Sequence, residues 1–177
     1  DGYCVVTLSW VFFTFFGMLP FYFSGSIDTI TNAFFETMSG FTTTGATILD
    51  DIESLSHGML FWRSLTQWIG GLGIVFFTIA ILPIFTTGGV QLFSAESTGV
   101  THDRTHPKIN VMAKWLWTIY LVLTVSETVL LMFGGMSLFD AICQSFATTA
   151  TGGYSTKQNS ISYWNSPYIE YVVAIFM

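Results

Sequence analysis

Two short segments of the sequence combine oxygen-bearing residues with glycine and contain no acidic or basic side chain. The first reads Thr-Thr-Thr-Gly-Ala-Thr over residues 42–47, and the second reads Thr-Ala-Thr-Gly-Gly-Tyr-Ser over residues 149–155. Such segments can bind a cation, because backbone carbonyls and hydroxyls can replace the water that an ion loses on entering a narrow site. Glycine supports this chemistry, since it allows the dihedral angles that turn successive carbonyls toward one axis.

Each segment follows a pattern that predicts a short helix. Asp28 is expected to cap the first helix, which ends at Gly40. Ser137 and Asp140 have the spacing of a capping box at the start of the second helix. A dozen helical residues rise by roughly 18 Å, which is about half the thickness of a bilayer.

The two segments align with each other at a shift of 108 residues. The shift pairs Ala33 with Ala141, Glu36 with Gln144, Thr37 with Ser145, Thr43 with Thr151 and Gly45 with Gly153. Both units read as spanning helix, half-helix, Thr/Gly strand and spanning helix, so the sequence predicts an internal repeat. Irregular backbone at membrane depth must be shielded by protein or line a watery cavity.

The composition indicates that these elements lie in a membrane. Of the 177 residues, 51% are hydrophobic and 9% are charged, whereas a soluble domain averages about 25% charged residues. Five Lys and Arg cannot form a nucleic-acid surface, and the high hydrophobicity excludes a disordered chain. The expected spans are residues 4–23, 65–85 and 111–133, with a fourth that starts at residue 168.

These spans divide the chain into two units and a connection. Residues 1–85 form the first repeat, with a re-entrant loop over 24–58, and residues 111–177 form the second. The connection over 86–110 is placed in the cytoplasm, because basic residues gather in and beside it. These residues are Arg104, Lys108 and Lys114. The chain begins without Met and stops inside its fourth span, so it is expected to be a fragment of a longer protein.

Three charged residues fall in apolar surroundings. Glu36 and Arg63 are interpreted as an ion pair that supports the Thr/Gly segments, although each could instead extend separately to the membrane interface. Glu127 lies inside an apolar span and is a functional candidate with an unknown partner.

Other motifs have a plainer interpretation. Gly70, Gly71 and Gly73 are expected to allow close helix packing rather than to form a hinge. His102 and His106 are four residues apart but lack a third His or Cys ligand nearby, so no transition-metal site is expected. The acidic cluster at the outer side is interpreted as part of a solvated loop, and the two cysteines are interpreted as small hydrophobic residues. These residues are Asp50, Asp51, Glu53, Cys4 and Cys143.

The chain resembles the TrkH family of bacterial potassium-uptake proteins over nearly its whole length. The resemblance is carried by residues 35–47, by Gln-Trp-Ile-Gly-Gly-Leu-Gly over 67–73, and by the second unit from Met136 to Thr156. It implies an all-α membrane protein of the potassium-channel type, with four units of helix, pore helix plus filter strand, and helix. The resemblance also implies a multi-pass protein of the bacterial inner (plasma) membrane, which forms a homodimer and binds a cytoplasmic nucleotide-binding subunit of the TrkA type. The carbonyl-donating filter positions would be Thr43, Thr44, Gly45, Thr151, Gly152 and Gly153.

The expected function is therefore potassium uptake, with K⁺ as the transported ion and no bound cofactor. Sodium or mixed transport within the same superfamily remains an alternative, although filter glycines at 45 and 153 favour potassium, because plant relatives with Ser at a filter Gly transport sodium. An intramembrane hydrolase is the alternative of another class. The chain lacks a Gly-x-Ser-x-Gly elbow, which argues against an enzyme.

The chain holds only two of the four filter strands that the resemblance implies. The gating loop of the family's third repeat and the pore-facing Arg of its fourth are not in it. Two strands cannot close a coordination ring, so this polypeptide alone is expected to show no selective conduction. Potassium flux from liposomes that contain only these residues would contradict the expectation.

Overall fold

The computed structural model describes residues 2–73 and 109–177. The second expected span beyond residue 73 lies outside the described residues, as do the connection, His102, His106, Arg104 and Lys108. The described chain is entirely helical and loop. Its elements are α1 (Gly2–Gly17), α2 (Leu19–Phe23), α3 (Ile30–Phe41), a helix over residues 57–73, α5 (Ile109–Phe133), α6 (Leu138–Thr149), the 3-10 helix η1 (Ser160–Trp164) and α7 (Pro167–Phe176).

Helix α5 contains the segment Lys114–Phe133, which is long and apolar enough to cross a membrane. Within the described ranges it is the one helix that meets both criteria, and the apolar helices Thr7–Phe23 and Pro167–Phe176 are shorter. α1 and α2 follow each other with a turn at Met18, where backbone bonds from Met18 to Thr14 and from Tyr22 to Met18 continue the helical path. The expected first span is therefore helical on both sides of one irregular residue.

The two short helices have the predicted length, but one of the two predicted caps is wrong. Thr29, not Asp28, caps α3, since its side chain accepts a hydrogen bond from the Asn32 N–H at 3.3 Å while Asp28 is exposed. The capping box of α6 is confirmed: Ser137 accepts from the Asp140 N–H at 3.1 Å and donates to its carboxylate at 2.7 Å. Both helices have 12 residues, and their bounds differ by the predicted 108 positions.

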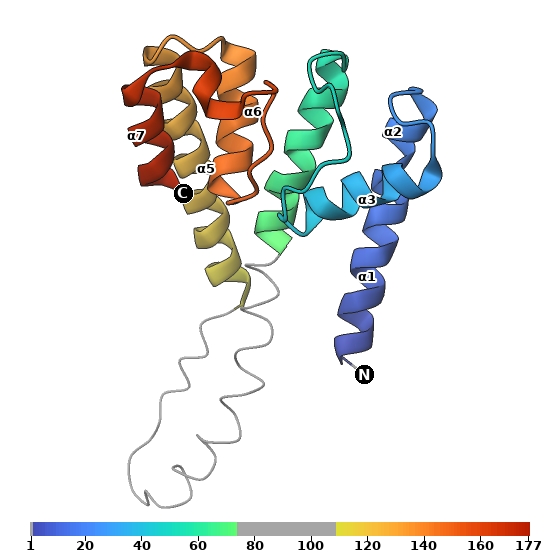
Figure 1. Ribbon diagram of the computed structural model, residues 1–177. Helices are drawn as coiled ribbons and strands as arrows, with labels where there is room; N and C mark the ends of the chain where they lie inside the picture. Colours follow the sequence, from blue (N-terminus) through green and yellow to red (C-terminus); the bar gives the residue numbers. More distant parts are fainter. Residues whose placement is uncertain (1, 74–108) are drawn as a thin grey trace, which may run out of the picture.

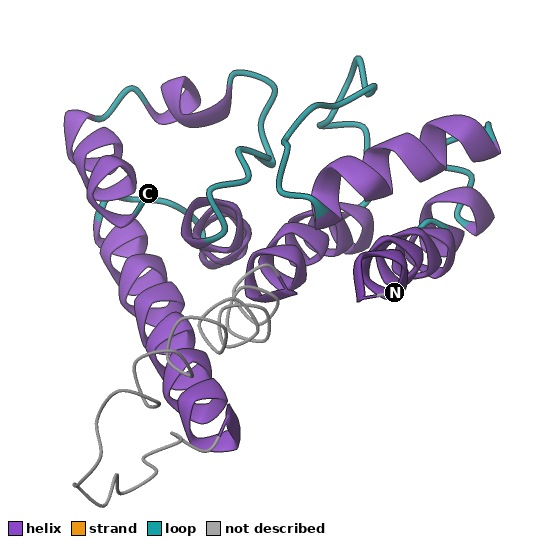
Figure 2. Ribbon diagram, turned by 90° about the horizontal axis from the view of Figure 1, so that it is seen from below, coloured by secondary structure: helices purple, strands orange, loops and turns teal. Residues whose placement is uncertain are grey.

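The elements form two groups that meet at their loops. α3 packs against α1, whereas α6 packs against α5 and α7 (Figure 1). The loops that follow α3 and α6 run beside each other between the two groups (Figure 2). Each group has its own apolar core. The first is built on Met18, Phe21, Ile27 and Ala33, and the second on Leu131, Met136, Ala141, Ile169, Val172 and Val173.

The helix over residues 57–73 lies against the C-terminal ends of both short helices. A Cβ added at Gly70 would overlap the carbonyl oxygen of Phe41 at the end of α3. A Cβ at Gly71 would lie 3.0 Å from the Cβ of Ala150, directly after α6, and 2.7 Å from the Tyr120 hydroxyl. The prediction that these glycines allow close packing is therefore confirmed.

Replacing Gly70 with Ala is expected to lower the free energy of unfolding by about 1–3 kcal/mol, because the added methyl meets backbone rather than a movable side chain. Gly58→Ala is the matched control, since it lies in the same helix with nothing within 4 Å of the new Cβ. Thermal unfolding of the detergent-solubilised protein measures both variants. Equal stability of the two would contradict the packing role.

Candidate functional site

Both short helices end in the same backbone motif, which starts each Thr/Gly segment. In the first, the Thr44 N–H donates to the Ser39 carbonyl at 2.9 Å and the Thr43 N–H donates to the Gly40 carbonyl at 3.0 Å. In the second, the Gly152 and Thr151 N–H groups make the corresponding bonds at 2.8 Å each. This pattern is a Schellman cap, and its left-handed position normally holds Gly.

A β-branched threonine occupies the left-handed position in both caps. Thr43 and Thr151 each have φ of 52°, a conformation that bulky residues avoid. Two residues later, Gly45 and Gly153 again have positive φ, at 75° and 85°. Left-handed residues therefore alternate with other conformations at the same places in both segments. Backbone in strained regions is found at functional sites more often than elsewhere.

The two segments touch each other through their backbones and through one tyrosine. A Cβ added at Gly45 would overlap the carbonyl oxygen of Gly152. The hydroxyl of Tyr154, in the second segment, lies 2.8 Å from the Glu36 carbonyl in α3 and 3.3 Å from the Ala46 carbonyl in the first segment. The structure thus brings the two sets of predicted filter residues together.

The predicted ion pair between Glu36 and Arg63 is present. The Arg63 Nε donates to Glu36 Oε1 at 2.7 Å, and both side chains are almost completely buried. Glu36 also accepts from the Thr47 hydroxyl at 2.9 Å and from the Ile48 N–H at 3.0 Å. The carboxylate therefore fixes the end of the first segment to its own helix.

The other side of Arg63 holds the second segment. Its Nη1 donates to the Ser155 carbonyl at 3.0 Å, and the guanidinium lies 3.6 Å from the centre of the Tyr154 ring. A flat guanidinium can stack on an aromatic face while its N–H groups donate in the plane. One buried ion pair consequently joins both segments to the helix over residues 57–73.

Sequence reasoning missed Gln67 and Tyr154 as site residues. Gln67 is fully buried, its Oε1 accepts from the Tyr154 N–H at 3.2 Å, and a side chain at Gly152 would overlap its amide. Gln67 is the first residue of the Gln-Trp-Ile-Gly-Gly motif. The sequence signal that could have identified it as a site residue is a polar side chain within an apolar run. In the second unit Gln144 stands at the position of Glu36, and Asp140 accepts from the Thr156 hydroxyl at 2.6 Å.

The loops around Glu53 and Lys157 are also joined. The Ile52 N–H donates to Gln158 Oε1 at 3.1 Å, and Lys157 forms an ion pair with Glu53 at 3.4 Å. Partial burial works against the charge of Lys157, but the hydrogen bond and charge of Glu53 outweigh it and raise the pKa of the lysine. The carboxylates of Asp50 and Asp51 are exposed beside this contact.

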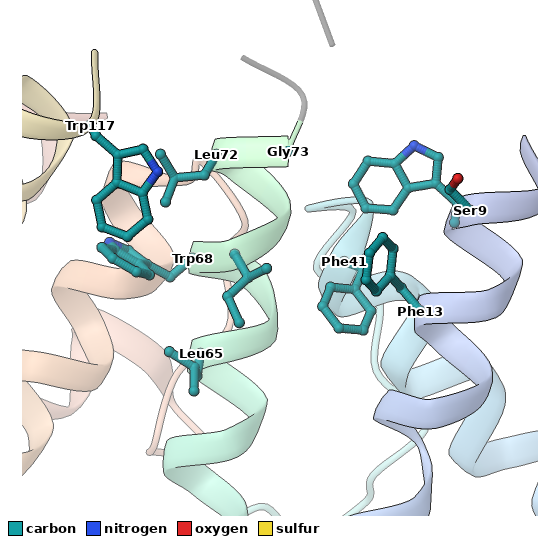
Figure 3. A pocket seen from close by; sticks show the side chains of 10 residues that line it. Ser9, Phe13, Phe41, Leu65, Trp68, Leu72, Gly73 and Trp117 are labelled. Carbon is teal, nitrogen blue, oxygen red and sulfur yellow. The ribbon is translucent and has the colours of Figure 1, made fainter. Parts of the chain in front are cut away.

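A separate cavity of about 600 Å³ lies beyond the ends of the short helices. The helix over residues 57–73 stands between Trp117 of α5 on one side and Phe13 and Phe41 on the other (Figure 3). The lining of the cavity is apolar apart from Ser9, so the cavity offers a cation few oxygen ligands. The cavity is distinct from the Thr/Gly segments.

Comparisons with known proteins show the family to which the chain belongs. The family model described as "TrkH: Cation transport protein" matches residues 1–177. The chain belongs to the TrkH family. It is 50% identical to the Trk system potassium uptake protein TrkH of Escherichia coli K12, covering 100% of this chain and 37% of that protein. It is 36% identical to TrkG of the same organism, over 99% of this chain and 37% of that protein.

A solved TrkH structure has the same fold. The crystal structure of the potassium transporter TrkH from Vibrio parahaemolyticus matches with a TM-score of 0.83 and 38% identity, over 99% of this chain and 35% of that chain. The present chain therefore spans little more than a third of the length of its TrkH relatives. The family is one of membrane cation transporters and not of enzymes.

Arg63→Gln is expected to lower the free energy of unfolding by about 3–5 kcal/mol, because it leaves the Glu36 carboxylate buried without its charged partner. The double variant Glu36→Gln/Arg63→Gln should lose less than the sum of the two single changes. Chemical unfolding of the detergent-solubilised protein gives these values. As a control, Lys157→Gln breaks a partly exposed pair and should cost less than about 1 kcal/mol. Strict additivity of the two buried substitutions would contradict the pairing energy.

Proposed function

We propose that this chain forms two of the filter-bearing units of a potassium-uptake protein of the TrkH family. In this proposal α3 and α6 are pore helices, and Thr43, Thr44, Gly45, Thr151, Gly152 and Gly153 offer their backbone carbonyls to K⁺. The observation that carries the proposal is the alternation of left-handed residues at the same positions of two touching segments. Successive carbonyls of a regular strand point in opposite directions, and left-handed residues at every second position break this pattern.

Two further features support a cation path. The half-helices end at the filter segments, so the negative ends of their dipoles, each roughly half a charge, favour a cation. The filter segments themselves contain no charged residue, and they supply only carbonyl and hydroxyl oxygens. Oxygen ligands without a fixed charge suit a monovalent ion that must bind and then leave.

The wider assembly is part of the same proposal. The chain would lie in the bacterial inner membrane with the connection over 86–110 on the cytoplasmic side. The remaining units, a second copy of the protein and a TrkA-type subunit would complete the transporter. The two E. coli proteins that are similar to this chain are named as Trk system potassium uptake proteins, which supports this assignment.

The glycines at 45 and 153 provide a matched test. In both, an added Cβ is strained by positive φ, but only at Gly45 would it also overlap the neighbouring segment at Gly152. Gly45→Ala in the full-length protein should therefore abolish uptake, while Gly153→Ala should weaken it and raise the ratio of sodium to potassium transport. Uptake of radioactive rubidium and sodium by bacteria that lack their own potassium systems measures both.

Wild-type uptake and selectivity in both variants would exclude these segments as the filter. If the native protein itself transports sodium in preference to potassium, the result would instead favour the sodium-transporting alternative of the same superfamily. Immunodetection of each variant in the membrane fraction separates a transport defect from poor expression.

A further inference from the structure

Glu127 is a buried acid that the proposed filter does not use. It lies in the C-terminal half of α5 and is 0% exposed, and neither carboxyl oxygen has a hydrogen-bond partner in the described chain. A carboxylate in this state would pay a large desolvation cost with no compensation.

The threonine hydroxyls that flank Glu127 in α5, and those of the facing helix α6, donate to backbone carbonyls. Thr124 donates to the Tyr120 carbonyl at 2.8 Å, and Thr128 donates to the Thr124 carbonyl at 2.8 Å. On the facing helix α6, Thr148 donates to the Gln144 carbonyl at 2.9 Å, and Thr149 donates to the Ser145 carbonyl. A hydroxyl that donates its one proton to a carbonyl still has lone pairs with which it can accept a hydrogen bond.

Thr148 is the hydroxyl next to the carboxyl group. Its oxygen receives one long bond of 3.4 Å from the Gln144 amide and has a second lone pair. The Gln144 Oε1 is also buried without a partner. Glu127 is therefore buried beside a hydroxyl that can accept its proton, and no hydrogen bond in the described chain compensates a negative charge on its carboxyl oxygens. This arrangement suits a neutral carboxylic acid and not a carboxylate.

No charged group from the elements packed around Glu127 pairs with it in the described chain. On α6, Asp140 is bonded to Ser137 and Thr156, and Cys143 lies beside Ser64 of the helix over 57–73. The remaining titratable groups of these elements are engaged elsewhere, exposed or near the helix ends. These are Lys114, Tyr120, His57, Arg63, Tyr168, Glu170 and Tyr171.

We propose that Glu127 is a proton-binding site whose occupancy controls the packing of α5 against α6 and, through it, the second filter segment. The proton-bearing acid donates to Thr148, three residues before Thr151 in the same C-terminal turn. Loss of the proton to water leaves a buried negative charge without a hydrogen-bond partner between the two helices, which separates them and disturbs the segment. The link to the filter rests on the proposed function, whereas the proton site does not.

Infrared difference spectroscopy of the full-length protein tests the proton site directly. The native protein at neutral pH should show the C=O stretch of a buried protonated carboxyl, which disappears in Glu127→Gln. The control Glu170→Gln removes an exposed acid of α7 and should leave the band unchanged. Thr148→Val removes the acceptor and should shift the band to higher frequency. Absence of the band from the native spectrum, or its persistence in Glu127→Gln, would overturn the proposal.

The pH dependence of rubidium uptake in proteoliposomes tests the control of the filter. Native uptake should fall at alkaline pH by up to about tenfold per pH unit, as expected for the loss of one proton. Glu127→Gln, which keeps an N–H donor and cannot ionise, should retain its uptake there, whereas Glu170→Gln should follow the native profile. Equal alkaline profiles of native protein and Glu127→Gln would overturn the regulatory role. A protonated-carboxyl band in a protein that transports no potassium would count against the proposed function and not against the proton site.

Discussion

The buried ion pair of Glu36 and Arg63 is the interaction on which the arrangement of the loops depends. A charge in an apolar protein interior is tolerated only when its partner and its remaining hydrogen bonds are in place. Here the carboxylate also binds Thr47 and Ile48, and the guanidinium also binds Ser155 and covers the ring of Tyr154. The cost of burying two charges is offset by their attraction and by these hydrogen bonds. The same bonds fix two irregular segments that have no regular secondary structure of their own.

The two units have the same backbone conformation at the helix ends, but different side chains support it. Both end a 12-residue helix in a Schellman cap with a left-handed threonine, and both place a left-handed glycine two residues later. Around this shared backbone the first unit uses an acid at position 36, while the second has the neutral Gln144 there. The support of the second segment comes instead from Gln67 and Arg63, which belong to the first unit. Equivalent backbones therefore lie in unequal surroundings.

Patterns local in sequence predicted much of this structure. Helix lengths, the capping box at Ser137 and the shift of 108 residues follow from spacing and composition, and the ion pair follows from the cost of isolated charges in apolar segments. The cap was predicted one residue too early because adjacent Asp28 and Thr29 can both cap a helix, and the apolar pattern does not distinguish between them. The roles of Gln67 and Tyr154 were not predicted, because their hydrogen-bond partners lie 87 and 118 residues away in the chain.

The bond from Arg63 to Ser155 spans 92 residues, and this separation affects how the protein is made. While the ribosome is still adding the second unit, the guanidinium has neither its carbonyl partner nor the tyrosine ring above it. The contacts of Arg63 with the second unit can therefore form only after Tyr154 and Ser155 have been synthesised. Biogenesis of the two units is thus a joint event, completed when the later segment arrives.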